Sequence, residues 1–289
     1  MGLLEKFESV EIKAENQISE SDKIFCEAHQ TAYNDAKTAL SELYVIWEDI
    51  LNGQKEALKG TGNSSETYVA SGSISSLSKR KIERQIDELH PAFIECIVRH
   101  FRDTYHIMLE EYSIKKARIP EEPRWHSGPE FDKEMDAYEE AKRSLSLSYS
   151  QIVDLIFQQT GGRNLWEYAV YQLKEKCHSA VWIYDKCRYE RKGSMVQISS
   201  VVYSEYELSE GGKNIIRGLA HFETGNIGII PAEFSDLLEY RGPGYNALDF
   251  EECKKVTKLR LFKNGRLDIR FAEEAYAVQF IAGYLASLP

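Results

Sequence analysis

The sequence predicts an α+β protein, in which a long antiparallel helical amino-terminal part precedes a domain of antiparallel sheet and helices. Three observations support this prediction. Apolar residues recur at helical spacing over residues 21–58 and again over 78–108. From Met195 the apolar period changes to two, and residues 256–271 alternate on either side of Asn264-Gly265. Periods of 3.6 and 2 are those of a helix and a strand that each bury one face.

The first two segments predict two long helices joined by residues 60–78, which are rich in glycine and serine and carry no strong period. Alanine dominates the first half of residues 21–58 and permits close packing against a neighbouring helix. Pro91 falls inside the second segment, so that helix is expected to kink or restart near His90. We expect an antiparallel hairpin, which forms a bundle core, projects as an arm or builds a homo-oligomer.

The middle of the chain predicts a connector followed by short helices. Residues 119–130 contain three prolines and mark the best candidate for a domain boundary. Helices are expected over residues 131–143, 148–159 and 165–179. Ser148 or Ser150 can cap the second, Gly161-Gly162 ends it, and Asn164 caps the third. The predicted domains are therefore a helical hairpin or arm (1–120), a helical segment (121–190) and an α+β domain (191–289).

The last third of the chain predicts strands and two further helices. A strand is expected from Met195, and shorter ones near Ile215 and over 227–230. Pro231 suits the first turn of a short helix, and residues 241–246 read as a loop. Asn264-Gly265 predicts a two-residue type I′ turn, because that turn needs positive φ at both positions. Residues 272–288 close the chain as a helix.

The charge and the cysteine content of the chain indicate which classes of partner it binds and in which compartment it resides. The chain has 36 basic and 46 acidic residues, a formal net charge of −10. This charge argues against direct binding to nucleic acid or anionic membranes, which needs a cationic footprint, and it suits a basic protein partner. No apolar run approaches the length of a membrane span, and residues 1–10 lack the features of a signal peptide. Five cysteines without a C-x-x-C pair indicate reduced thiols in a cytoplasm, and no cofactor or metal is expected.

The motifs present in the chain are compatible with one class of enzyme. The chain has no phosphate-binding loop, nucleophile elbow or H-E-x-x-H motif. Restriction-type nucleases place an acidic residue upstream of Glu-x-Lys, where carboxylates hold Mg²⁺ and the lysine assists the attacking water. Asp185, Glu190 and Lys192 follow this order, although the triplet precedes the predicted strand at Met195. A second triplet, Glu252-x-Lys254, follows Asp249.

Aromatic residues are concentrated between residues 166 and 189. Tyrosine and tryptophan offer large contact areas at small entropic cost, and they are enriched at interfaces. They also stack on bases, or they can line the seam between the helical and α+β parts. The candidate partner-binding residues are Trp166, Tyr168, Trp182 and Tyr184.

The second half of the chain resembles a family of uncharacterised phage and mobile-element proteins, some of them encoded near or fused to DNA methyltransferases. The resemblance rests on residues 152–161, 165–173, 184–192 and 195–202, and on an F-K-N-G-N-x-H-x-x-F hairpin. Here Phe262-Lys263-Asn264-Gly265 and Phe271 match, whereas Arg266 stands in place of Asn and Asp268 in place of His. The resemblance implies a phage or mobile-element setting and no particular reaction.

These observations favour a non-enzymatic, oligomeric interaction protein in the host cytoplasm, which inhibits a host defence complex by steric occlusion or by acidic mimicry of DNA. The first alternative is a metal-dependent DNA-processing enzyme that uses Asp185, Glu190 and Lys192. The second is an accessory DNA-binding module of a methyltransferase system, for which residues 79–81 and Arg84 are the obvious basic cluster.

Overall fold

The computed structural model describes residues 17–59, 78–183, 186–203, 206–239 and 246–286. The chain forms two compact units, Met1–Thr104 with Leu109–Gly162, and Tyr105–Met108 with Arg163–Pro289. Long helices followed by an antiparallel sheet with helices confirm the α+β class. The predicted ranges 1–120, 121–190 and 191–289 stay a prediction. The predicted loops at 60–78 and 241–246 lie almost wholly outside the described residues.

Helix α2 (Glu20–Ala57) begins at a capping box. The Ser19 hydroxyl accepts a hydrogen bond from Asp22 N at 3.2 Å, and the Asp22 carboxylate accepts one from Ser19 N at 3.2 Å. This exchange satisfies two backbone donors that the first turn leaves unpaired, so it fixes where the helix starts. The long helix predicted over residues 21–58 is confirmed.

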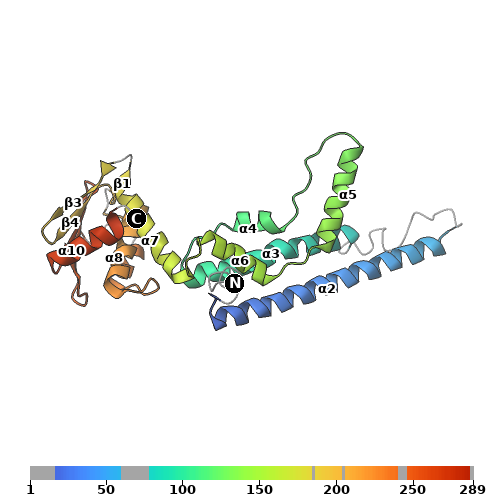
Figure 1. Ribbon diagram of the computed structural model, residues 1–289, viewed down its shortest axis with the longest axis horizontal. Helices are drawn as coiled ribbons and strands as arrows, with labels where there is room; N and C mark the ends of the chain where they lie inside the picture. The colour runs from blue at the N-terminus through green and yellow to red at the C-terminus, as the bar shows by residue number, and fades with distance from the viewer. Residues whose placement is uncertain (1–16, 60–77, 184–185, 204–205, 240–245, 287–289) are drawn as a thin grey trace, which may run out of the picture. The chain divides into compact units, whose positions relative to one another are not determined.

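Helix α3 (Lys79–Tyr105) packs along α2. Tyr33 Oη lies 2.8 Å from His90 Nδ1, and Asp22 Oδ1 lies 2.7 Å from His100 Nε2. The two helices are antiparallel, because the paired residue numbers rise along α2 as they fall along α3 (Figure 1). Pro91 lies inside the helix without interrupting it, so the helix does not restart near His90.

Three shorter helices complete the first unit: α4 (Glu111–Arg118), α5 (Pro129–Ser144) and α6 (Tyr149–Gln159). The predicted connector is non-helical over residues 120–128. Ser148 occupies the N-cap position of α6, but its hydroxyl pairs with Ser150 Oγ at 2.8 Å and caps no backbone group. Gly161 and Gly162 have φ of 63° and 79°, a left-handed conformation that ends the helix.

In the second unit, α7 (Leu165–Val181) is capped by Asn164, whose side chain accepts from Glu167 N at 2.9 Å. A small pair of strands, β1 (Trp182–Ile183) and β2 (Lys186–Cys187), follows it. Helices α8 (Glu210–Thr224), α9 (Ala232–Glu239) and α10 (Glu274–Phe280) and the π-helical turn η2 (Ile281–Leu285) pack with α7 and the main sheet. The predicted helices after Asn164, after Pro231 and at the end of the chain are confirmed.

The main sheet is antiparallel, in the order β3-β4-β7-β6-β5. Its strands are β3 (Tyr189–Lys192), β4 (Met195–Ile198), β5 (Ala247–Asp249), β6 (Val256–Leu261) and β7 (Leu267–Phe271). Val196, Leu259 and Ile269 are fully buried on one face, where they join the core with residues of α8 and α10. The alternate residues form the opposite face, called the open face below.

The predicted hairpin is confirmed, but its predicted turn is wrong. Phe262 N donates to Arg266 O at 2.9 Å and Gly265 N donates to Phe262 O at 3.0 Å, so the loop has three residues. Gly265 has φ of 90°, whereas Asn264 lacks positive φ. This is the longer hairpin connection, with glycine at the left-handed position. Val201 N and Val202 N both donate to Gly265 O, and this tertiary contact favours the observed loop.

The strands predicted near Ile215 and over residues 227–230 are wrong. Ile215 and Ile216 are fully buried in α8, while residues 227–230 form a turn and an irregular segment. The adjacent isoleucines suggested a buried strand, but Leu219 and Ala220 continue the same stripe at helical spacing. Ser209 caps the helix by accepting from Gly212 N at 3.1 Å.

Candidate functional site

The Glu-x-Lys triplet lies on strand β3, not before a strand as predicted. Glu190 and Lys192 share the open face of the sheet, because the intervening residue Arg191 points to the other face and pairs with Glu274. Lys192 Nζ lies 3.2 Å from Glu190 Oε2 and donates to Gln197 Oε1 at 3.0 Å. Asp185 is outside the described residues, so the structure places two of the three predicted catalytic residues together at an exposed sheet edge.

The open face continues this polar network across the sheet. Gln197 Nε2 lies 3.2 Å from both carboxylate oxygens of Asp268, and Arg266 Nε lies 2.9 Å from Asp268 Oδ1. Lys258 Nζ bonds to Asp249 at 2.7 Å. These carboxylates are engaged by protein cations and amides. Within the described residues, no three His, Cys, Asp or Glu side chains are grouped so as to hold a metal ion.

The second triplet, Glu252-x-Lys254, does not form a catalytic arrangement; its backbone contacts helix α8. Lys254 N and Lys255 N donate to Glu223 Oε1 at 2.6 and 3.2 Å, which ties the start of β6 to the end of α8. Asp249 lies on β5 and pairs with Lys258. Asp249 and Lys254 therefore have separate structural roles.

The predicted partner-binding aromatics do not form one cluster. Trp166, at the start of α7, is 49% exposed and packs its ring edge-on against Tyr105 at 4.8 Å. Tyr168 lies beside Tyr171, at 6.3 Å between ring centroids. Trp182, at the other end of the helix, donates from Nε1 to Leu285 O at 2.9 Å. Tyr184 is outside the described residues.

Helix geometry explains this dispersal. Trp166 and Tyr168 are two positions apart, so they point roughly 200° apart around the axis, and Trp182 follows Trp166 by about 24 Å of helix. Composition revealed that the aromatics were concentrated in the sequence, but the helical period separates them. Trp166 keeps the greatest exposure of the predicted aromatics that the structure describes.

The negative charge is segregated in the first unit. Residues 1–104 and 109–162 contain 29 acidic and 19 basic residues, whereas residues 105–108 and 163–289 contain 17 of each. The formal net charge of −10 therefore belongs to the helical unit, while the unit that contains the sheet is neutral. An electrostatic attraction to a basic partner would act on the long helices.

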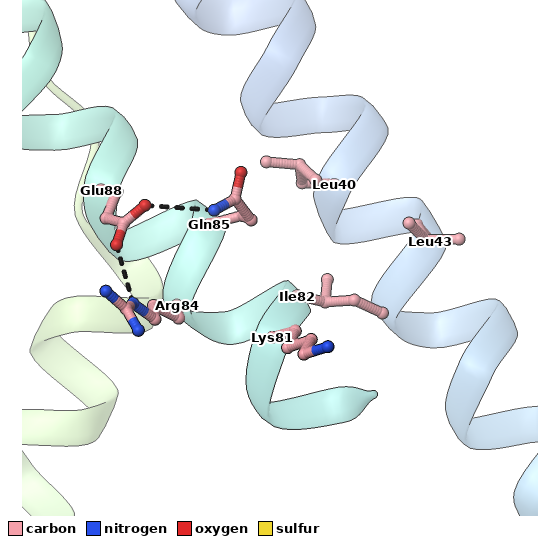
Figure 2. Close-up of a pocket in the computed structure, with 7 residues that line it drawn as sticks. All are labelled: Leu40, Leu43, Lys81, Ile82, Arg84, Gln85 and Glu88. Carbon is pink, nitrogen blue, oxygen red and sulfur yellow. Dashed lines mark hydrogen bonds and ion pairs between the residues drawn. The ribbon is translucent and has the colours of Figure 1, made fainter. Parts of the chain in front are cut away.

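A hollow of about 370 Å³ opens between α2 and α3 (Figure 2). Leu40 and Leu43 of α2 line one wall, and Ile82 lies across from them on α3. Polar residues form the α3 rim, where Glu88 accepts from Arg84 Nε at 2.8 Å and from Gln85 Nε2 at 3.1 Å. The apolar wall and polar rim resemble the layout of protein interfaces, which surround an apolar centre with polar groups.

The outward side of α2 beside this hollow exposes large apolar side chains. Ile46 is 54% exposed and Ile50 43% exposed, whereas Trp47 is buried. The helical spacing over residues 21–58 predicts a single apolar face, whereas α2 carries two. The missed signal is the alternating spacing of four and three residues from Ala39 to Ala57, which runs beside the stripe that faces α3.

No family model, curated protein or solved structure matches this chain. The resemblance of its second half to phage and mobile-element proteins therefore stays a prediction. None of the helices in the described part of the chain combines the length and the apolar character needed to cross a bilayer.

Proposed function

We propose that this chain is a non-enzymatic interaction protein of a phage or mobile genetic element, which binds a host defence complex in the host cytoplasm. The observation that supports the proposal is the first unit, where a long helix with exposed Ile46 and Ile50 belongs to the part that carries all of the net negative charge. Exposed apolar groups surrounded by charge are typical of protein-binding surfaces.

Two mechanisms are consistent with this surface. Steric occlusion requires only that the helical unit cover the partner's working surface. Acidic mimicry requires the carboxylates to replace phosphates in a DNA-binding groove. The two differ in their response to salt, because screening weakens charge pairs at exposed sites and leaves apolar contacts intact.

The test is a pull-down of the tagged full chain from host lysates that contain defence systems, followed by mass spectrometry and by binding measurements with the purified partner. A stoichiometric host nuclease or defence complex supports the proposal. Binding that falls steeply with salt and is displaced by duplex DNA supports mimicry, whereas salt-insensitive binding supports occlusion. Failure to capture any such complex from these lysates contradicts the proposal.

The second candidate function is metal-dependent DNA processing. It is favoured by the position of Glu190 and Lys192 on one face of β3, since the carboxylate and the lysine of such sites project from a strand. This alternative predicts Mg²⁺-dependent cleavage of DNA that is lost in Glu190→Ala and retained in Glu252→Ala. Cleavage at the same rate in both variants would remove this assignment.

A further inference from the structure

The outward side of α2 carries a second apolar stripe, which we call the outer seam. Its residues follow alternating steps of four and three: Ala39, Leu43, Ile46, Ile50, Gly53 and Ala57. The seam lies roughly 100° around the helix from the stripe that faces α3. It is accessible, because Ile46 and Ile50 are about half exposed and a Cβ built at Gly53 would meet no atom within 4 Å.

A repeat of four and three residues is a property of helices that pack along another helix. An apolar residue every 3.5 positions keeps one seam facing a partner, whereas a face that merely covers a globular core follows 3.6. The outer seam holds this repeat over 19 residues, from Ala39 to Ala57. The pattern therefore indicates that the segment bound at the outer seam is an α-helix.

Acidic residues flank the outer seam at intervals of seven. They are Asp35, Glu42, Asp49 and Glu56, and all four are exposed. Successive members stand about 10 Å apart along the axis and drift slowly around it. Glu56 pairs with Lys59 at 3.2 Å, but no cation among the described residues pairs with Asp35, Glu42 or Asp49. In helix pairs, the positions beside the apolar seam are those that form interhelical ion pairs.

We infer that the outer seam binds an amphipathic helix of another protein, whose apolar stripe meets α2 and whose adjoining flank carries lysine or arginine opposite the acidic row. This inference rests on the proposed function of partner binding, and it names the partner's chemistry. The hollow lined by Leu40, Leu43 and Ile82 adjoins the seam and receives a large apolar anchor from the bound helix.

A second copy of this chain fits the seam less well. In an antiparallel pair of α2 helices the two acidic rows would face each other, and like charges at these positions are destabilising. In a parallel pair, each acidic row would face the opposite flank of its partner, where Leu40 lines the hollow beside α3 and Trp47 is buried. The repulsion between acidic rows in one orientation and the buried flank in the other therefore both favour a basic helix from a different chain.

The test uses three helical peptides of about four heptads each, with identical apolar seams and with lysine, glutamate or glutamine on the flanks. Their affinities for the full chain are measured by fluorescence anisotropy at two salt concentrations. We expect the lysine-flanked peptide to bind at least about tenfold more tightly than the glutamate-flanked one, with the difference shrinking as salt rises. Equal affinities, or no binding by any of the three, overturn the inference.

Variants of the full chain sharpen this test. The double substitution Glu42→Lys, Asp49→Lys is expected to reverse the order of affinities, so that the glutamate-flanked peptide binds more tightly than the lysine-flanked one. The double substitution Ile46→Asp, Ile50→Asp is expected to abolish binding of the peptides. Val45→Asp is the matched control, because Val45 is 55% exposed but points roughly 100° away from Ile46. All of these positions are exposed on α2, and circular dichroism is the check that each variant keeps its helix content.

Two outcomes separate this inference from the proposed function. If the wild-type chain and the Ile46→Asp, Ile50→Asp variant capture the same host complex equally well, the inference fails while the proposed function stands. If neither captures a complex, the proposed function fails, and the peptide affinities still decide the inference. A homodimer that sedimentation detects, and that this variant dissociates, assigns the seam to a second copy and overturns the inference.

Discussion

Arg266 Nε lies 2.9 Å from Asp268 Oδ1, on the open face of the sheet. These are the two positions at which the hairpin departs from the pattern that it otherwise resembles, and the structure pairs them with each other. The Asp268 side chain is only 10% exposed and also receives Gln197 Nε2 at 3.2 Å. The two departures thus form one charge pair, in which a largely buried carboxylate depends on its neighbours.

The first prediction concerns this pair. Arg266→Ala is expected to lower the free energy of unfolding by about 1–2 kcal/mol, because it leaves a desolvated carboxylate with only the Gln197 amide. The matched control is Lys258→Ala, which breaks the more exposed pair with Asp249 on the same face and should cost at most about 0.5 kcal/mol. Urea denaturation measures both values, and equal costs would contradict the prediction.

The second prediction compares two helical glycines. A Cβ at Gly218 of α8 would lie 2.6 Å from Cys177 Sγ, so Gly218→Ala is expected to destabilise the protein by about 1–3 kcal/mol through overpacking. Gly53 of α2 has open space around it, and Gly53→Ala should stabilise its helix by about 1 kcal/mol. Thermal unfolding measures both changes. Stabilisation by both substitutions would show that helix propensity, not contact, decides, and destabilisation by both would contradict the prediction for Gly53.

These glycines illustrate what the sequence could not predict. The long helices, the hairpin and the helix after Asn164 follow from periodicity and caps, which are local properties. The strand predicted near Ile215 is part of helix α8, because adjacent isoleucines favour a buried strand, and the role of Gly218 is visible only where Cys177 approaches it. The hairpin loop differed for a similar reason, since Val201 and Val202 bind the carbonyl of Gly265 from outside the hairpin.

The candidate site likewise has features that local sequence patterns could predict and features that only the tertiary structure shows. Alternation could have placed Glu190 and Lys192 on one strand face, but strand β3 is short, polar and exposed, so it carries no apolar signal. Proximity in sequence suggested one aromatic surface, yet Trp166 and Trp182 stand at opposite ends of α7. The outer seam of α2 was fully readable as a repeat of four and three residues, and only the exposure of Ile46 and Ile50 shows that α3 leaves it open.

The third prediction concerns thiol reactivity. Burial raises the pKa of Cys177 to about 12, with no side-chain area exposed, whereas Cys187 is exposed on β2. The thiolate is the reactive species, so Cys187 should be labelled rapidly by a maleimide at neutral pH and Cys177 only as fast as the protein unfolds. Mass spectrometry of labelled peptides measures both rates, and labelling in denaturant is the control. Rapid labelling of Cys177 in the native protein would contradict its placement.

The fourth prediction concerns the buried relay between α2 and α3. Leu147 N donates to Tyr33 Oη at 3.3 Å, and the same hydroxyl lies 2.8 Å from His90 Nδ1. His90 is 1% exposed, and burial lowers its pKa, with the charge of Lys37 adding to the effect. Protonation would place a positive charge in this buried site, where desolvation and the charge of Lys37 disfavour it.

The lowered pKa means that the folded state binds fewer protons than the unfolded state near the unfolded pKa of about 6.5. The stability contributed by neutral His90 is therefore present above that pH and is lost as the pH falls toward the folded-state pKa. His90→Gln should cost more stability at about pH 8 than at about pH 5. Urea unfolding of the first unit, followed by the fluorescence of buried Trp47, measures the cost at each pH. A cost that is constant, or larger at acid pH, would show that the neutral relay does not contribute to folding.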